Sequence, residues 1–274
     1  MDLVELQRQI PVRTNLPRLP RAAAIILSVF LAGVLWHLVV LWWKLPAFIL
    51  PPPSLVWQRF LEGLADGSLL RHSAVTLSEV LSGLFLGVSV ATALGYLLAK
   101  SQWFERLLAP YIVASQSVPI VAIAPLLIIW FGPGLFSKVL ICALIVFFPV
   151  LVNTIVGLHT VSEDLQDLMR SLKASRWQTI RFLEVPAAMP VFLGGLRIGA
   201  TLSVIGAVVG ELVGSDRGLG FLINVGRGQY DTALVFVAVF TLVLLALSLY
   251  GIVLFAEHKL LSWRQRPEEF IRHP

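Results

Sequence analysis

The chain has 274 residues, of which 57% are hydrophobic and only 14% are charged, and its formal net charge is +5. An average soluble protein carries roughly 25% charged residues, so this composition excludes an ordinary water-soluble domain and indicates a chain embedded in a lipid bilayer. The one cysteine, Cys142, excludes a disulfide framework, a four-cysteine zinc site and an iron–sulfur cluster. We expect Cys142 simply to pack in the interior.

Six apolar segments are long enough to cross the hydrocarbon layer as helices, which takes ~20 residues each. The sequence therefore predicts an all-α membrane protein with six transmembrane helices, at residues 22–43, 75–99, 107–131, 139–158, 187–213 and 233–256.

The distribution of basic residues predicts the orientation of these helices. Most of the 21 Lys and Arg residues fall in the segments on one side of the predicted membrane, and that side is expected to be cytoplasmic. Lys138 falls in an outer segment in this scheme. The first 21 residues contain four arginines but no apolar stretch, so they predict a cytoplasmic tail rather than a signal peptide. We expect a multi-pass protein of the cell membrane, with a cytoplasmic tail at 1–21, a transmembrane domain at 22–256 and a second cytoplasmic tail at 257–274.

Two of the predicted spans carry small residues four positions apart. Such ladders let helix backbones approach closely where lipid gives no hydrophobic drive for association. We expect both helices to pack tightly in the centre of the bundle. The ladder residues are Gly83, Gly87, Ala91 and Gly95 in the second span, and Gly195, Gly199, Gly206 and Gly210 in the fifth.

A short amphipathic helix is predicted after the first span, between residues 54 and 66, with Ser54 as its N-cap. Two positions remain open for it: along the outer membrane interface, or packed on the bundle as an ordinary surface helix.

The chain lacks the motifs of the obvious enzyme classes. It contains no G-x-x-x-x-G-K-[ST] loop to cradle the phosphates of ATP. No predicted span contains aspartate, and His37 is the only histidine within a span, so a buried nucleophile–base pair is not evident. We expect a chain that binds no cofactor of its own; an intramembrane enzyme and a structural membrane scaffold are the rival hypotheses.

The inner loop at 159–186 holds the most informative polar sequence. Ser162 is a good helix N-cap, and Glu163 and Asp164 follow in the first turn, where the helix dipole favours negative charge. Leu165 and Leu168 begin an apolar stripe at helical spacing. This pattern predicts a short amphipathic helix that docks in a groove of another protein or lies on anionic lipid.

The same loop resembles the E-A-A-x3-G-x9-I-x-L-P signature of the permease subunits of bacterial ATP-binding-cassette (ABC) importers. Asp167 stands in place of the glutamate, Leu168 and Met169 in place of the alanines, Lys173 in place of the glycine, and residues 183–186 in place of I-x-L-P. Lysine at the glycine position costs about 1 kcal/mol if the backbone keeps a positive φ there, or else it changes the turn.

Further blocks resemble the branch of this family that serves sulfonates, taurine, nitrate and vitamin-like heterocycles. They lie at residues 117–132, 147–157 and 186–199, and in the stretch that begins at Gly210. The resemblance implies the type I ABC importer permease fold. It also implies four kinds of partner: a second permease chain, expected to be an identical one, two cytoplasmic ATPase subunits that bind ATP and Mg, an extracytoplasmic solute-binding protein and the bilayer.

In that family the signature loop forms a coupling helix that docks on the ATPase. The resemblance assigns ATPase coupling to Asp164, Asp167, Leu168, Met169, Arg170, Ser171, Leu172, Lys173, Ala174, Ser175 and Arg176.

Polar side chains inside spans are costly in lipid, so they face a cavity or a neighbouring helix. For Glu211 we also expect an ion pair with Arg217 or Arg227, and for Arg197 a pair with Glu184, a reach toward the inner face, or contact with an anion. The candidate substrate-pathway residues are Ser115, Gln116, Ser117, Asn153, Thr154, Thr201, Ser203 and Glu211.

Basic residues are scarce within the spans, which disfavours a small inorganic anion as the substrate. We expect a neutral heteroaromatic solute such as riboflavin or a pyrimidine precursor of thiamine. Sulfonate or taurine, and nitrate or bicarbonate, are the alternatives.

Overall fold

The computed structural model describes residues 21–262, and every regular element within that range is a helix. The predicted all-α membrane class is therefore confirmed. Residues 1–20 and 263–274, which include nearly all of the first predicted tail and two-thirds of the second, lie outside the described residues.

The chain divides into two compact units at Ser54. The first unit contains α2 (Arg21–Trp43), an apolar helix that ends before Lys44, whose φ is 47°. Large side chains such as Phe30 and Trp42 are exposed along α2, as expected for a helix that faces lipid.

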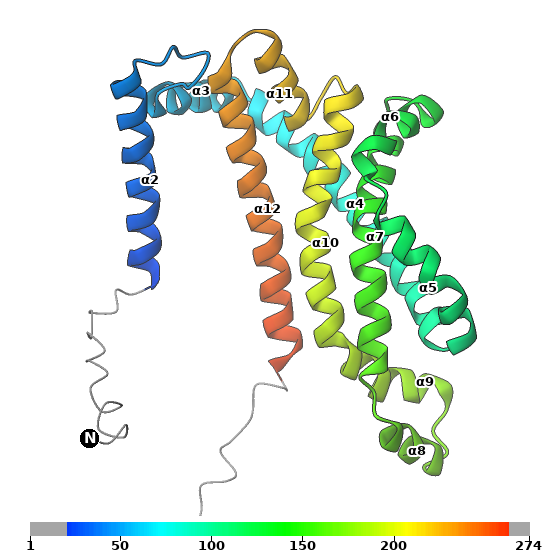
Figure 1. Cartoon of the computed structure of the whole chain (residues 1–274). Coiled ribbons are helices and arrows are strands. Elements are labelled where there is room, and N and C mark those ends of the chain that lie inside the picture. The colour runs from blue at the N-terminus through cyan, green and yellow to red at the C-terminus, as the bar shows by residue number, and fades with distance from the viewer. Residues whose placement is uncertain (1–20, 263–274) are drawn as a thin grey trace, which may run out of the picture. The chain divides into compact units, whose positions relative to one another are not determined.

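The second unit begins within α3 and contains the rest of the described chain (Figure 1). Its elements are α3 (Pro53–Ala65), α4 (Ser68–Ala99), α5 (Gln102–Gln116), α6 (Ile120–Phe131), α7 (Leu135–His159), α8 (Glu163–Ser171), α9 (Arg176–Thr179), the π-helical turn η2 (Ile180–Glu184), α10 (Val185–Gly214), α11 (Leu219–Gly228) and α12 (Thr232–Leu260).

Helix α7 is the centre of this unit, and its main neighbours are α4 and α10. In Figure 1, α7, α10 and α12 run side by side, with α8 and α9 at one end of the bundle and α11 at the other. Both glycine ladders press against α7. A Cβ placed on Gly206 would lie 2.8 Å from the Cα of Cys142, and one on Gly83 would overlap the same cysteine. The predicted tight packing is confirmed, and Cys142 is buried between the two ladders.

The third predicted span, at 107–131, is not one continuous helix. It is broken into α5 and α6, whose axes differ in direction by 92°. Pro119 lies at the break, and a proline disfavours helical geometry in the residue before it. Pro125 lies within α6 without breaking it. The described residues therefore contain five unbroken candidate spans, or six when the bent pair counts as one.

The short helix α3 begins at Pro53, so Ser54 lies in its first turn rather than at its cap. Arg59 of α3 donates to Asp231 at 2.9 Å, and Asp231 caps the start of α12. Helix α3 is thus fastened to the α11 end of the bundle. In the turn that follows it, the hydroxyl and backbone N–H of Ser68 lower the pKa of Asp66.

Candidate functional site

Helix α8 is bounded at both ends by residues of its own loop, and hydrogen bonds close its C-terminal end. Ser162 is the N-cap residue with extended backbone geometry, but its side chain makes no capping hydrogen bond; Glu163 and Asp164 fill the first turn as predicted. At the other end, Lys173 donates its N–H to the carbonyl of Arg170 at 2.9 Å, and Ala174 donates to Met169 at 3.0 Å. These two bonds form a Schellman motif with a left-handed residue at Lys173, whose φ is 53°. Lysine therefore adopts the positive φ expected at the glycine position.

A second short helix follows this turn. Ser175 and Gln178 form a reciprocal capping box at the start of α9, with bonds of 3.3 and 2.7 Å. The chain then passes through η2 into α10, where Pro186 occupies the first turn. The predicted coupling residues therefore lie in one helix–turn–helix, on a loop whose geometry is set by its own caps.

The apolar stripe of α8 is left uncovered. Leu165, Leu168 and Leu172 are 47%, 52% and 68% exposed. Asp167 and Arg170 form an ion pair of 2.9 Å beside them, and both side chains are more than two-thirds exposed. Helix α8 therefore presents a mixed apolar and charged surface at the end of the bundle.

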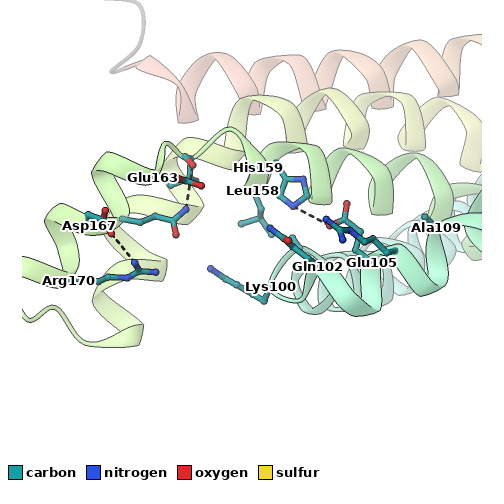
Figure 2. A pocket seen from close by; sticks show the side chains of 13 residues that line it. Lys100, Gln102, Glu105, Ala109, Leu158, His159, Glu163, Asp167 and Arg170 are labelled. Carbon is teal, nitrogen blue, oxygen red and sulfur yellow. Dashed lines mark hydrogen bonds and ion pairs between the residues drawn. The ribbon is translucent and has the colours of Figure 1, made fainter.

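A cavity of about 970 Å³ lies between the start of α5 and the junction of α7 with α8, and Figure 2 shows the side chains that line it. Its wall includes His159 and Glu105, whose side chains approach within 3.4 Å, and also Lys100 and Arg170. Sequence reasoning missed the contributions of α4 and α5 to this site. The chain contains no local signal for them, because the contact joins segments far apart in sequence.

The base of the loop is attached to α4 by a polar cluster. Glu184 of η2 is buried and accepts hydrogen bonds from Lys100 at 2.5 Å and Tyr96 at 3.1 Å. Of the three alternatives for Arg197, the pair with Glu184 is not formed, because Glu184 bonds Lys100 and Tyr96.

Arg197 instead pairs with Glu257 of α12 and lies over the ring of Tyr250. These contacts join α10 to α12 in the half of the bundle that is nearer to α8.

The candidate pathway residues are not gathered in one place. Thr154 and Ser203 are buried, and their hydroxyls donate to carbonyls of their own helices at 2.7 and 2.8 Å. Ser115 and Thr201 also donate to carbonyls of their own helices, at 2.9 Å in each case.

Two other candidates do meet. Gln116 and Asn153 line one cavity of about 450 Å³, between the α5–α6 break and the middle of α7. Ser117 lies in the break itself and is exposed.

At the α11 end, four buried side chains and the partly buried Ser215 form what we call the polar network. Lys138 donates to Glu79 at 2.9 Å and to Ser215 at 2.6 Å, while Thr76 donates to Glu211 at 2.6 Å. The second oxygen of Glu211 accepts from the backbone of Gly220 in α11 at 2.5 Å. The network thus joins α4, α7, α10 and α11.

The polar network corrects two expectations from the sequence. Lys138 is not an outer-loop residue, because α7 begins at Leu135 and leaves the residue only 5% exposed. Glu211 does not pair with Arg217, which is largely exposed beside Asp216. The described ion pairs include none for Arg227. Within residues 21–262, no group of three or more His, Cys, Asp or Glu side chains is arranged to hold a metal ion.

Comparison with known proteins places this architecture in a family. Residues 83–262 match the model of the binding-protein-dependent transport system inner membrane component. The chain is 44% identical over 265 residues to the riboflavin transport system permease protein RibX of Chloroflexus aurantiacus, covering 94% of this chain and 99% of that protein. It is 35% identical to the formylaminopyrimidine transport permease protein ThiX of Halalkalibacterium halodurans, covering 80% and 87% of the two chains.

Other relatives widen the range of solutes. The chain is 33% identical to the taurine transport system permease protein TauC of Escherichia coli, covering 85% of this chain and 88% of that protein. Among solved structures, an inward-facing MetNI methionine ABC transporter shares the fold, with a TM-score of 0.60 and 19% identity over 74% of this chain and 98% of the matched chain. The protein is therefore a multi-pass membrane protein that belongs to the binding-protein-dependent ABC importer permeases, which are non-catalytic subunits that work with a separate, ATP-hydrolysing subunit.

Proposed function

We propose that this permease forms the translocation pathway for a vitamin-like heterocycle, either riboflavin or a pyrimidine precursor of thiamine, delivered by an extracytoplasmic binding protein. The observation that carries this proposal is the similarity to RibX, which extends over nearly the full length of both chains at 44% identity. The similarity to ThiX supports the same chemical class of solute.

The state of the basic side chains within the spans also favours a neutral solute. Lys138 in α7 is bonded to Glu79, and Arg197 in α10 is paired with Glu257. A sulfonate in the pathway would gain most from an uncompensated cation. Both of these cations are already neutralised by buried or partly buried carboxylates. Taurine or another sulfonate is the second candidate because TauC is 33% identical over most of both chains.

For energy coupling, the proposal assigns α8 to a cleft of the ATPase. The uncovered leucines and the exposed Asp167–Arg170 pair provide the mixed surface that helix-in-groove recognition requires. The complex would contain two permease copies and two ATPases, and ATP and Mg would be bound by the ATPases alone. ATP binding would favour the outward-open arrangement, and hydrolysis would restore the inward-open one.

The orientation follows from the same assignment. Helix α12 ends at Leu260 at the α8 end of the bundle (Figure 1). A cytoplasmic ATPase on α8 would therefore place the C-terminus in the cytoplasm, and the distribution of basic residues supports the same side for the N-terminus.

The test of the substrate is uptake by cells that carry the whole transport operon. Radiolabelled riboflavin, formylaminopyrimidine and taurine are supplied separately, and the control strain lacks only the permease gene. We expect permease-dependent uptake of one of the two heterocycles. Uptake of taurine alone would overturn the proposed substrate class and leave the family assignment intact.

A further inference from the structure

The break between α5 and α6 opens a cavity beside the middle of α7. Its volume is about 450 Å³, within the range of small-molecule sites. The end of α5, the start of α6, the middle of α7 and Ile198 of α10 all contribute to its wall. Three consecutive helices and the later α10 therefore converge on a space the size of a bicyclic or tricyclic ring system.

Polar atoms with spare hydrogen-bonding capacity line this cavity. Asn153 uses its amide nitrogen to donate to the carbonyl of Pro149 at 2.8 Å, which leaves its side-chain oxygen to accept. The side chain of Gln116 has no hydrogen bond to any described residue, so its amide can both donate and accept. Pro149 has no N–H, so the carbonyl of Ile145, another residue of the wall, lacks its usual helical partner.

An aromatic face lies next to these groups. Phe148 lines the cavity, and its ring packs edge-on against Phe147 with 5.1 Å between the ring centroids. Such a contact restrains the ring and leaves it available for stacking. The remaining wall is aliphatic, and no lining side chain carries a charge. The cavity therefore combines one aromatic surface with uncharged donors and acceptors.

We propose that this cavity is a binding site within the permease for a planar, uncharged heteroaromatic ring, with Phe148 stacked on its face and Gln116 and Asn153 bonded to its edge. This inference rests on the proposed function, because it assigns that solute to particular side chains. A charged sulfonate would find no compensating cation among the lining side chains.

The experiment measures binding to the purified permease–ATPase complex without the binding protein. Tritiated riboflavin and formylaminopyrimidine are each titrated against wild type and against Gln116→Leu and Phe148→Leu. The matched control is Phe85→Leu, which changes a phenylalanine on α4 that is 77% exposed. Thermal unfolding of each complex is recorded, and Gln116→Leu is expected to leave it unchanged because that side chain has no partner to lose.

We expect saturable binding of the transported heterocycle, weakened about tenfold by Gln116→Leu, as the loss of one good hydrogen bond implies. Phe148→Leu is expected to weaken binding by a similar factor, and Phe85→Leu to have no effect. If wild type imports a heterocycle and both variants bind it as tightly as wild type, the proposed site is wrong and the proposed function stands. If cells import only taurine, the substrate class fails, and this site fails with it.

Discussion

The polar network and α8 lie at opposite ends of the bundle and use charge in opposite ways. Lys138, Glu79 and Glu211 are all buried, and each accepts or donates hydrogen bonds across helix boundaries. Asp167 and Arg170 also form a close ion pair, but both side chains are largely exposed. A buried charge that loses its partner is strongly destabilising, whereas an exposed pair contributes little. The polar network therefore fixes helices to each other, whereas α8 leaves its own charged side chains free for a partner.

Replacing residues 167–176 with a Gly/Ser linker should have the largest effect, on assembly rather than on folding. The uncovered leucines of α8 provide the contact proposed for the ATPase, so its removal should abolish co-purification of the two subunits. Tagged permease is purified from membranes and the bound ATPase is quantified. The single change Arg71→Ala serves as a control, because Arg71 lies near the start of α4, at the end of the bundle away from α8. Undiminished ATPase binding by the linker variant would contradict the assignment of α8.

Lys138→Met should cause the largest loss of stability. It leaves Glu79 buried without its cation, at a cost of about 3–5 kcal/mol. Denaturant unfolding of the purified permease measures the change. The double variant with Glu79→Met removes both charges and should recover much of the loss. If Lys138→Met unfolds at the wild-type denaturant concentration, the buried pair does not hold the bundle together.

Gly206→Ala should cost about 1–3 kcal/mol, because the new Cβ meets the backbone of Cys142 and forces α10 away from α7. Gly251→Ala on α12 is the matched control, since a Cβ there has nothing within 4 Å. That variant should be neutral or slightly stabilising, as alanine favours helix over glycine. Equal effects of the two substitutions in a thermal unfolding assay would argue against close packing at Gly206.

Asp167→Ala should change the free energy of unfolding by no more than about 0.5 kcal/mol, because it breaks a solvent-exposed pair. The same denaturant assay used for Lys138→Met gives a direct contrast between the two ion pairs. A loss comparable to that of Lys138→Met would show that α8 is part of the stable core, which the exposure of Leu168 and Leu172 argues against.

Features with local signals were predictable from the sequence. The apolar spans, the glycine ladders and the caps of α8 each follow from residues a few positions apart, and Lys173 takes the left-handed geometry that its place in the signature implies. Which side chains pair with each other across helices was not predictable in this way. Lys138 was assigned to an outer loop because hydropathy treats every lysine as costly to bury. It does not register that Glu79, on another helix, neutralises the charge of this lysine.

The α5–α6 break shows a related limit, because the two prolines of this segment predict a bend but not which of them breaks the helix. A proline within an apolar segment is tolerated in α6 at Pro125 but accompanies a 92° turn at Pro119. The difference depends on what packs around each position, which a single helix cannot specify. For the same reason, Gln116 and Asn153 were identified as polar span residues, but their meeting in one cavity, together with Phe148, required the fold.

The contact of Glu184 with Lys100 and Tyr96 determines how a push on α8 would be distributed. A force on α8 would reach α7 through the backbone on one side and α10 through α9 and η2 on the other. The hydrogen bonds of Glu184 to Lys100 and Tyr96 would add a third connection, to α4. The three helices that take up the load are the ones that share the glycine-packed centre. They would be expected to turn as one block, with bending confined to more loosely attached parts such as α5.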